Sequence, residues 1–397
     1  MSTCKHEAGD LNGLLNRLCQ ATRNFQKDEN YLERTTALEG FSQTSPELGE
    51  TAGCGTIDGA PILLLCVRIA VDLDIFTTLA ERDGPVSLEE LAVVKNAYPL
   101  FAERVLRILA AIGYLIEHEV GVYTANAMAR YLSIPEAVAI LKFQFDLCMP
   151  LYAKAPEYFR ERGFQTPSES NKGLFQYVNK TEESMWSLMI KKPEHINDLH
   201  VHMAGRSAHW PNWIDWFPVQ ECIIDEFENE VGGVLMVDVA GGRGHDLKKF
   251  QANFPHAPGR LAVEDLPQVL EGISLSPGIE CQSIDLFEPQ PVKGARAYYM
   301  KFVMHDWADR RCQQILQQFK GAMRKGYSKL LIEEVILADK DAEPLPSLGD
   351  WMMLAVHCGM ERTRSHREKL LTLAGFRVVR FRDPPYPGQS VIEAEVA

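Results

Sequence analysis

The chain has 397 residues, of which 46% are hydrophobic and 24% are charged. This composition is typical of soluble globular proteins, and the length allows two or three domains. The formal net charge of −13, without a basic run, argues against nucleic acid and anionic membranes as partners. Nine cysteines without a Cys-x-x-Cys pair favour reduced thiols over a disulfide framework.

Targeting segments are not expected. The first residues lack the apolar stretch of a signal peptide. The most apolar run, 61–76, is interrupted by Arg68, Asp72 and Asp74 and is too short to span a bilayer. We therefore expect a cytoplasmic protein without membrane contact.

Residues 1–50 form a polar arm with a predicted helix over 9–37. Leucines repeat at helical spacing along this helix and give it one apolar face, at Leu11, Leu14, Leu15 and Leu18. Such a face needs a partner, which is either the same chain or a second copy of it.

The region 51–135 has the pattern of a winged helix. Helices are predicted over 86–94 and 100–113, and the strands of a wing over 114–116 and 122–124. A winged helix alone would indicate DNA binding. The acidic chain argues against that function.

A helical region follows over 136–220. Strands and helices then alternate over 221–397. The alternation predicts an α/β fold with a Rossmann-like, doubly wound and mostly parallel sheet, its last two strands forming an antiparallel edge. The predicted strands cover residues 234–239, 261–264, 294–300, 329–336, 377–381 and 391–396.

The stretch 235–245 predicts a ligand-binding turn. A buried strand ends at Asp238, and a cluster of small residues precedes a helix. A dinucleotide fold would need a glycine at Leu247, and a P-loop would need Gly-Lys-Ser/Thr. An acid-x-small-Gly-Gly-x-Gly pattern remains, with its glycines at Gly241, Gly242 and Gly244. A strand–turn–helix without a ligand is the alternative.

A second motif, Lys-x-x-x-His-Asp-Trp-x-Asp-x-x-Cys, covers residues 301–312. Together with the glycine turn, it resembles the caffeate-type, metal-independent O-methyltransferases, and in particular their fungal secondary-metabolism branch. The resemblance covers roughly residues 55–385. It implies S-adenosylmethionine (SAM) as the cofactor, no metal, and a homodimer formed through the winged-helix-like domain.

The resemblance also implies how SAM is bound. Asp238 and the glycines would hold its methionine part, and Asp265, in a Glu-Asp-Leu-Pro segment, its ribose. The pair Asp285 and Leu286 would bind the adenine, and Lys301 would lie at the adenosine end. A helix cap for Asp238, exposed loop acids and a solvated lysine remain as alternatives.

His305 is the predicted general base, because methyl transfer to a hydroxyl requires its deprotonation and imidazole can accept that proton near neutral pH. In the family, two glutamates flank this histidine, and Glu334 and Glu361 match them. They would orient the base, although surface glutamates are the alternative. We expect Asp306 and Asp309 to cap the next helix.

Substrate-contacting residues are harder to predict, since apolar pocket walls and core residues look alike in a sequence. The candidates are aromatic side chains, adaptable methionines and one further histidine. They are Phe143, Trp186, Met304, Met352, Met353 and His357. Ordinary core roles remain open for all of them.

Two positions depart from the family pattern: Ala240 replaces a usual glycine, and the run 364–367 is unusually basic. Neither removes a catalytic group. We therefore expect an enzyme that methylates a phenolic or enolic hydroxyl of a polyketide-type metabolite. The alternatives are a SAM-bound pericyclase or dehydratase on the same scaffold, and a winged-helix regulator that senses SAM.

Overall fold

The computed structural model describes residues 53–192, 196–199, 201, 212–228, 233–385 and 388–397. The helix predicted over 9–37 lies outside these residues. The chain divides into two compact units, Met1–Met149 with Lys192–Trp210 and Pro150–Lys191 with Pro211–Ala397. The region 136–220 therefore contributes to both units. None of the helices in the described ranges is long and apolar enough to cross a membrane.

The first unit contains the predicted wing. Its strands form an antiparallel sheet in the order β1-β3-β2, and their buried side chains pack with those of the surrounding helices. Its elements are α3 (Gly53–Asp72), α4 (Ile75–Ala80), β1 (Val86–Ser87), α5 (Leu88–Val94), α6 (Pro99–Ala111), β2 (Ile116–Glu119), β3 (Val122–Thr124), α7 (Ala127–Tyr131), α8 (Pro135–Lys142) and the π-helix η2 (Phe143–Cys148).

The second unit is built on a seven-stranded sheet in the order β11-β12-β8-β7-β4-β5-β6. All neighbours are parallel except β12, which is antiparallel to both β8 and β11. The predicted antiparallel edge is thus confirmed. The strands are β4 (Val234–Val239), β5 (Arg260–Asp265), β6 (Ile279–Ser283), β7 (Ala297–Lys301), β8 (Lys329–Glu334), β11 (Phe376–Arg382) and β12 (Ser390–Val396).

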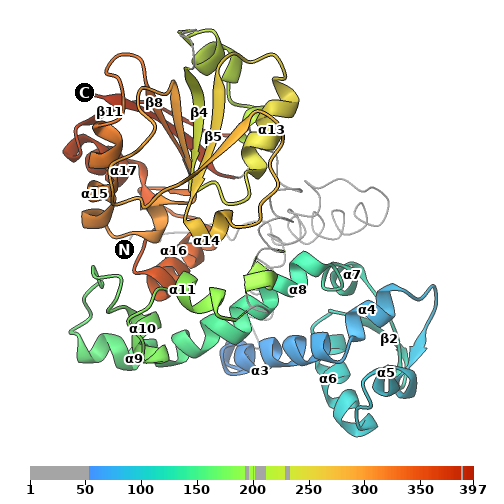
Figure 1. Cartoon of the computed structure of the whole chain (residues 1–397). Helices are drawn as coiled ribbons and strands as arrows, with labels where there is room; N and C mark the ends of the chain where they lie inside the picture. Colours follow the sequence, from blue (N-terminus) through green and yellow to red (C-terminus); the bar gives the residue numbers. More distant parts are fainter. Residues whose placement is uncertain (1–52, 193–195, 200, 202–211, 229–232, 386–387) are drawn as a thin grey trace, which may run out of the picture. The chain divides into compact units, whose positions relative to one another are not determined.

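Helices cover both faces of this sheet (Figure 1). On one face lie α15 (Asp309–Lys320) and α17 (Arg364–Leu373), and on the other lies α13 (His245–Asn253). Strand β7 shows how the faces alternate: Tyr298 packs in the core under α15, and Tyr299 in the opposite core. Both faces are therefore buried, as a parallel sheet requires.

The strand order reverses at β4, since the chain continues from β4 to β5 on one side and later returns to β7 on the other. Ligands of such sheets bind at the carboxyl ends of the strands near this point. Four polar residues stand at those ends, namely Asp238 on β4, Asp265 on β5, Lys301 on β7 and Glu334 on β8.

Phe319 of α15 tests the packing of the second unit. Its side chain is fully buried in the core, so Phe319→Ala leaves a cavity and should lower the free energy of unfolding by about 3–5 kcal/mol. Phe164→Ala, at a side chain that is 77% exposed, should change it by less than about 0.5 kcal/mol. Equal urea midpoints for the two variants would contradict this assignment of the core.

Candidate functional site

The turn after β4 is shaped by residues that lack or nearly lack side chains. Ala240, Gly242 and Gly244 have φ angles of 54°, 58° and 69°, in the left-handed region that favours glycine. A Cβ on Gly241 would lie 2.4 Å from the carboxyl carbon of Asp238. Glycine is therefore required at 241, and Ala240 holds a conformation that costs about 1 kcal/mol.

Asp238 is buried below this turn with one oxygen, Oδ2, that has no hydrogen-bond partner among the described residues. Burial raises the pKa of this carboxyl, Asp246 adds to the effect, and Lys301 opposes it. A buried carboxylate with a free oxygen fits a cationic ligand group. SAM carries two such groups, an ammonium and a sulfonium, so this site suits it.

Asp265 and its neighbour Glu264 have different surroundings. The Asp265 carboxylate accepts hydrogen bonds from the N–H of Gly242 (2.8 Å) and of Leu266 (2.7 Å), so it lies at the glycine turn. Glu264 is fully buried and accepts from Gln290, and burial raises its pKa to about 7. Asp265 is thus the acid that stands at the strand end.

Lys301 lies in a cluster of acids that the sequence prediction missed. Its Nζ is 3.1 Å from an Asp246 oxygen and 3.9 Å from a Glu333 oxygen. Burial alone would lower the pKa of Lys301, but these carboxylates outweigh it and raise the pKa. Glu333 is the partner of Lys301 in the β7–β8 register, and Asp246 stands in the first turn of α13. Only the folded topology brings them together.

The predicted adenine segment follows β6. Asp285 is exposed, and its Oδ1 accepts the N–H of Phe287 (2.9 Å). Leu286 is partly buried against the core of the sheet. This segment therefore presents a carboxylate beside an apolar side chain.

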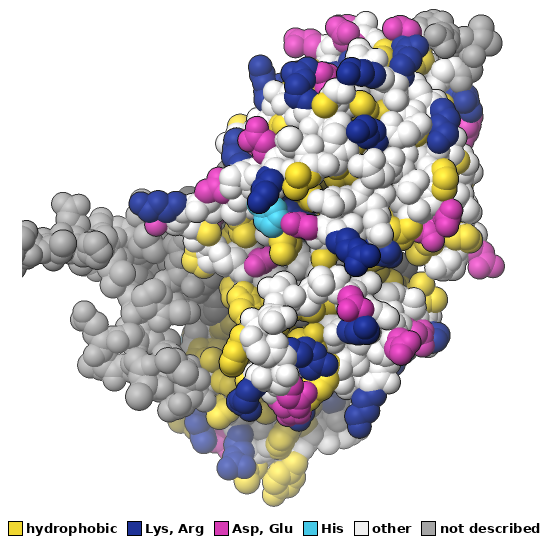
Figure 2. Space-filling view, turned by 90° about the vertical axis from the view of Figure 1, so that its left-hand side faces the viewer, with side chains coloured by type: hydrophobic (Ala, Val, Ile, Leu, Met, Phe, Trp, Pro, Cys, Tyr) yellow, Lys and Arg dark blue, Asp and Glu magenta, His cyan; other side chains and the backbone are white. Residues whose placement is uncertain are grey.

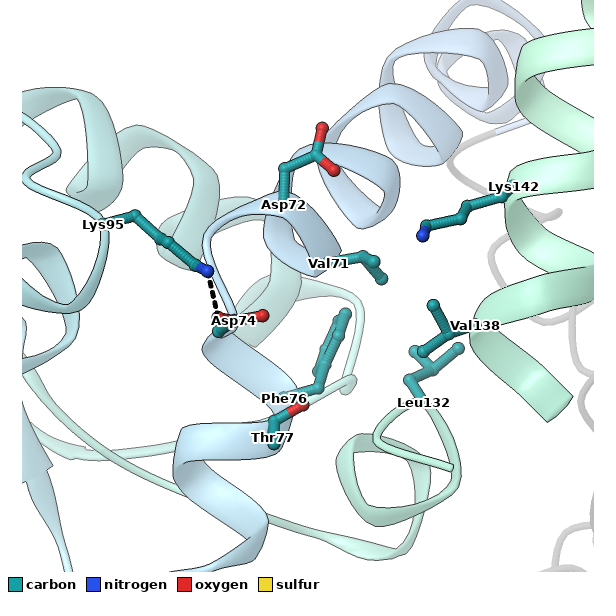
Figure 3. Close-up of a pocket in the computed structure, with 9 residues that line it drawn as sticks. All are labelled: Val71, Asp72, Asp74, Phe76, Thr77, Lys95, Leu132, Val138 and Lys142. Carbon is teal, nitrogen blue, oxygen red and sulfur yellow. Dashed lines mark ion pairs between the residues drawn. The ribbon is translucent and has the colours of Figure 1, made fainter. Parts of the chain in front are cut away.

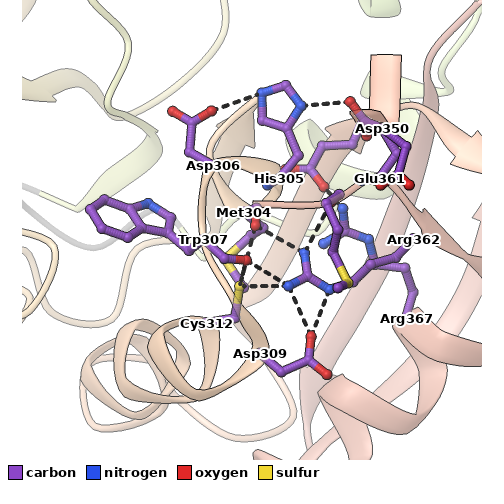
Figure 4. Close-up of polar contacts among 12 residues, drawn as sticks. Met304, His305, Asp306, Trp307, Asp309, Cys312, Asp350, Glu361, Arg362 and Arg367 are labelled. Carbon is purple, nitrogen blue, oxygen red and sulfur yellow. Dashed lines mark hydrogen bonds and ion pairs between the residues drawn. The ribbon is translucent and has the colours of Figure 1, made fainter. Parts of the chain in front are cut away.

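His305 lies in the short helix η5 (Met304–Asp306), directly after β7, and its side chain is 11% exposed. Its Nδ1 is 2.8 Å from Oε1 of Glu361 (Figure 4). An ionised carboxylate only accepts hydrogen bonds, so this contact assigns the proton to Nδ1 and leaves Nε2 unprotonated in the neutral ring. Nε2 lies 3.4 Å from Oδ1 of Asp306.

The two predicted glutamates contact different parts of His305, because Glu334 binds its backbone and Glu361 its ring. Oε1 of Glu334 accepts the N–H of His305 (2.9 Å), and its Oε2 forms an ion pair with Arg367. Both side chains of this pair are buried. The basic run 364–367 thus supplies a cation that compensates the buried charge of Glu334.

A second arginine fixes the turn that carries His305. Arg362 is completely buried and donates to the carbonyl oxygens of Met304 (3.0 Å) and Trp307 (2.6 Å), and to Asp309 (2.9 Å) (Figure 4). His366 lies 2.7 Å from the same aspartate. The planar guanidinium group of Arg362 has several N–H donors and can therefore bind several acceptors at once.

The prediction that Asp306 and Asp309 cap the next helix is wrong. The N-cap of α15 is Ala308, whose side chain cannot accept a hydrogen bond. Asp309 is the first residue of the helix and pairs with Arg362 and His366, and Asp306 lies near His305.

Glycine at 359 is required by a close approach of two backbone segments. A Cβ there would lie 2.0 Å from the carbonyl oxygen of His305. The next residue, Met360, donates its N–H to that same oxygen (2.9 Å). The loop that carries Glu361 is therefore bound directly to the turn that carries His305.

Two predicted substrate residues, Trp186 and His357, lie against each other. The rings of Trp186, on α11 (Met185–Ile190), and His357, the last residue of α16 (Pro344–His357), stack with centroids 5.7 Å apart. Nε2 of His357 is 3.6 Å from Oδ1 of Asp306. A second imidazole thus shares Asp306 as a neighbour with His305, and the ring of Trp186 lies against that imidazole.

The other predicted substrate residues have different positions. Met352 is half-buried on α16, and Met353 beside it is 7% exposed. Met304 is fully buried in the core and presents no surface to a ligand. Phe143 belongs to the first unit, where it begins η2.

The first unit contains a cavity of about 250 Å³ (Figure 3). Lys142, Val138 and Phe76 line it, and an ion pair between Lys95 and Asp74 (2.5 Å) lies at its edge. It contains neither a glycine turn nor a histidine. In the described part of the chain, no group of three His, Cys, Asp or Glu side chains is placed to hold a metal. The glycine turn and His305 both belong to the second unit.

Comparison with known proteins shows the family of this chain. Residues 216–377 match the O-methyltransferase domain family, and residues 62–134 match the O-methyltransferase dimerisation domain. The O-methyltransferase penC of Penicillium thymicola is 37% identical over 338 residues, covering 84% of each chain. A demethylsterigmatocystin 6-O-methyltransferase of Aspergillus flavus is 32% identical over 81% of this chain and 82% of its own.

Solved structures share the fold. LepI in complex with SAM has a TM-score of 0.83 at 22% identity, over 97% of this chain and 100% of that one. A structure described as a pericyclic reaction enzyme has the same TM-score and identity, over 97% and 99%.

These findings place the chain in a family of enzymes: it belongs to the O-methyltransferases, with the fungal enzymes of secondary metabolism among its relatives. As an O-methyltransferase, it uses SAM as its cofactor.

Gly359→Ala should move the turn that carries His305. We expect methyl transfer to fall about 100-fold, because small displacements of a base have effects of this size. Gly349→Ala is the matched control, since a Cβ at this position of α16 meets nothing within 4 Å. An active Gly359→Ala enzyme would refute the close packing described here.

Asp238→Asn separates cofactor binding from stability. Because burial raises the pKa of Asp238, the folded protein binds this proton more tightly than the unfolded chain does, and its ionisation costs stability as pH rises. At pH 8 the unliganded variant should therefore melt higher than the wild type, and the difference should shrink as the pH is lowered toward the ordinary pKa of a carboxyl group. SAM affinity, measured by calorimetry, should fall at least about tenfold. Unchanged SAM affinity would exclude Asp238 from the site.

Proposed function

We propose that this enzyme transfers the methyl group of SAM to a phenolic or enolic hydroxyl of a polyketide-type natural product. The observation that carries this proposal is the His305–Glu361 contact, which leaves Nε2 of the base unprotonated. The base also follows β7, next to β4 and its glycine turn. A proton acceptor and a SAM-binding turn at one sheet edge are what methylation of a hydroxyl requires.

The residues divide the work. SAM supplies an electrophilic methyl group when bound. Asp238 and the glycine turn would hold its methionine end, Asp265 its ribose, and Asp285 with Leu286 its adenine. Lys301 would lie at the adenosine end within its cluster of acids.

His305 takes the hydroxyl proton on Nε2 as the oxygen attacks. The resulting imidazolium is stabilised by the Glu361 carboxylate at Nδ1. Glu334 and Arg362 hold the backbone of this turn in place. The enzyme thus works mainly by alignment of the acceptor oxygen with the methyl group.

The substrate class is supported by the stacked rings of Trp186 and His357, which suit a flat aromatic ligand. A relative is named for a 6-O-methylation of demethylsterigmatocystin, which is consistent with such a substrate. We also place the enzyme in the cytoplasm.

We propose a homodimer formed through the first unit. Its dimerisation-domain match is accompanied by exposed apolar side chains on and between α5 and α6, at Val93, Tyr98, Leu100 and Phe101. On the face that Figure 2 shows, by contrast, acidic and basic side chains are interspersed without a continuous basic patch. Neither nucleic acid nor a membrane is proposed as a partner.

The second candidate is a SAM-bound cyclase or dehydratase, favoured by the fold shared with a pericyclic reaction enzyme. SAM would then act as a fixed positive charge and would not be consumed. The intact pair of His305 and Glu361 favours methyl transfer, because a ring closure without proton removal needs no such base.

Methyl-labelled SAM distinguishes the two candidates. In assays with phenolic and enolic polyketides, we expect a product heavier by one labelled methyl and an equal amount of S-adenosylhomocysteine (SAH). An isomerised or dehydrated product with SAM unconsumed would overturn methyl transfer.

Variants of the base test its role. His305→Gln should lower methyl transfer at least about 100-fold, and Glu361→Gln about 10-fold to 100-fold, with SAM affinity retained. Glu368→Gln, at an exposed position of α17, is the matched control. A His305→Gln enzyme at the wild-type rate would exclude this residue as the base.

A further inference from the structure

Asp350, in the middle of α16, contacts the loop that carries Glu361. Its Oδ1 accepts the backbone N–H of Glu361 at 2.9 Å, and Figure 4 shows the two residues beside His305. They are 11 positions apart, and the chain reverses between them at Cys358, whose φ of 59° lies in the left-handed region. The backbone of Glu361 is therefore bound back to the helix that precedes it.

This contact holds a residue whose carboxylate has few other partners. Oε1 of Glu361 lies at Nδ1 of His305, but its Oε2 is buried and has no hydrogen-bond partner among the described residues. A side chain that is held at one atom needs a fixed backbone to keep its direction. The direction of the Glu361 carboxylate therefore depends on the position of its own backbone.

His305 is held in the same way. Glu334 accepts the backbone N–H of His305, as Asp350 accepts that of Glu361. The N–H of Met360 donates to the carbonyl oxygen of His305 and joins the two segments. Each member of the His305–Glu361 pair is thus held at its backbone by a carboxylate from a neighbouring element.

The acid at position 350 holds Glu361 at an electrostatic cost. Burial raises the pKa of Asp350, the N–H of Glu361 opposes this effect, and the carboxylate of Glu361 adds to it. Two carboxylates near each other repel, so the pair contributes less to stability than a hydrogen bond to a neutral acceptor would. A local cost of this kind is typical of functional positions.

We propose that Asp350 is a positioning residue for the reaction, which holds the Glu361 carboxylate at Nδ1 of His305. Without its acceptor oxygen the loop is free to move, and the ring of His305 populates both tautomers. Only the tautomer with the proton on Nδ1 can take a proton on Nε2. The oxygen of Asp350, rather than its charge, has this role. The inference rests on the proposed methyl transfer and adds a residue to its mechanism.

Two substitutions separate the oxygen from the charge. Asp350→Ala removes the acceptor, whereas Asp350→Asn keeps a carbonyl oxygen of the same reach. With the full-length enzyme and a phenol that it methylates, we expect kcat to fall about tenfold in Asp350→Ala and at most about threefold in Asp350→Asn. KM and SAM affinity should stay within about twofold of the wild type, because Asp350 contacts neither ligand. A wild-type kcat in Asp350→Ala, or an equal loss in both variants, would overturn the inference.

Ser347→Ala is the matched control on the same helix. Its hydroxyl donates to the carbonyl oxygen of Glu343 and does not reach the loop of Glu361. We expect this variant to keep the wild-type kcat. A tenfold loss here would show that any disturbance of α16 lowers the rate, and would overturn the specific role of Asp350.

Nitrogen-15 NMR of His305 in the SAH complex gives a readout that a merely structural residue would not change. We expect the two ring-nitrogen signals of Asp350→Ala to approach each other as the tautomers mix. If this variant does not fold, Asp350→Glu decides the question, because it keeps the charge but displaces the oxygens by one methylene group. The same change is expected there, and signals at the wild-type positions in the folded variant would overturn the inference.

Failure of this inference and failure of methyl transfer are distinguishable, because the NMR measurement involves no turnover. Wild-type signals in the Asp350 variant with methylation intact overturn the role of Asp350 alone. A wild-type enzyme that transfers no label from SAM to any phenol or enol overturns the proposed reaction.

Discussion

The hydrogen bond between Glu361 and Nδ1 of His305 is the interaction on which the proposed chemistry of this enzyme depends. It fixes the direction of the ring and the nitrogen that carries the proton. The two residues are 56 positions apart in the sequence, so the fold of the second unit must bring them together. Arg362 performs this task locally, since it donates to the carbonyl oxygens on both sides of the base and follows Glu361 directly in the chain.

The second unit contains further buried charged groups, and two pairs of them compensate each other. Arg367 pairs with Glu334, and Lys301 with Asp246. Asp238 differs, because one of its oxygens has no partner among the described residues, and a charge of this kind is costly unless a ligand pairs with it. The unliganded site therefore stores an unfavourable interaction that a cationic cofactor relieves.

The sequence predicted well the parts of the structure whose signal is local. Two motifs, the run that ends at Asp238 and the segment around His305, can each be identified within about a dozen consecutive residues. Both lie at the carboxyl edge of the sheet in the structure. Strand β6 was missed, because only Ile279 in it is buried and its apolar pattern is weak. Contacts between distant segments were also beyond the sequence: Arg367 with Glu334, Glu333 with Lys301, and Asp306 between two histidines.

The tautomer of His305 is the most direct test of the central claim. Nitrogen-15 NMR of the SAH complex, with labelled histidine and with the His305 signals assigned by their loss in His305→Gln, reports which ring nitrogen carries the proton. We predict a protonated Nδ1 and an unprotonated Nε2 at pH 8. The opposite tautomer, with the proton on Nε2, would leave no acceptor for the substrate hydroxyl and would contradict the proposed mechanism.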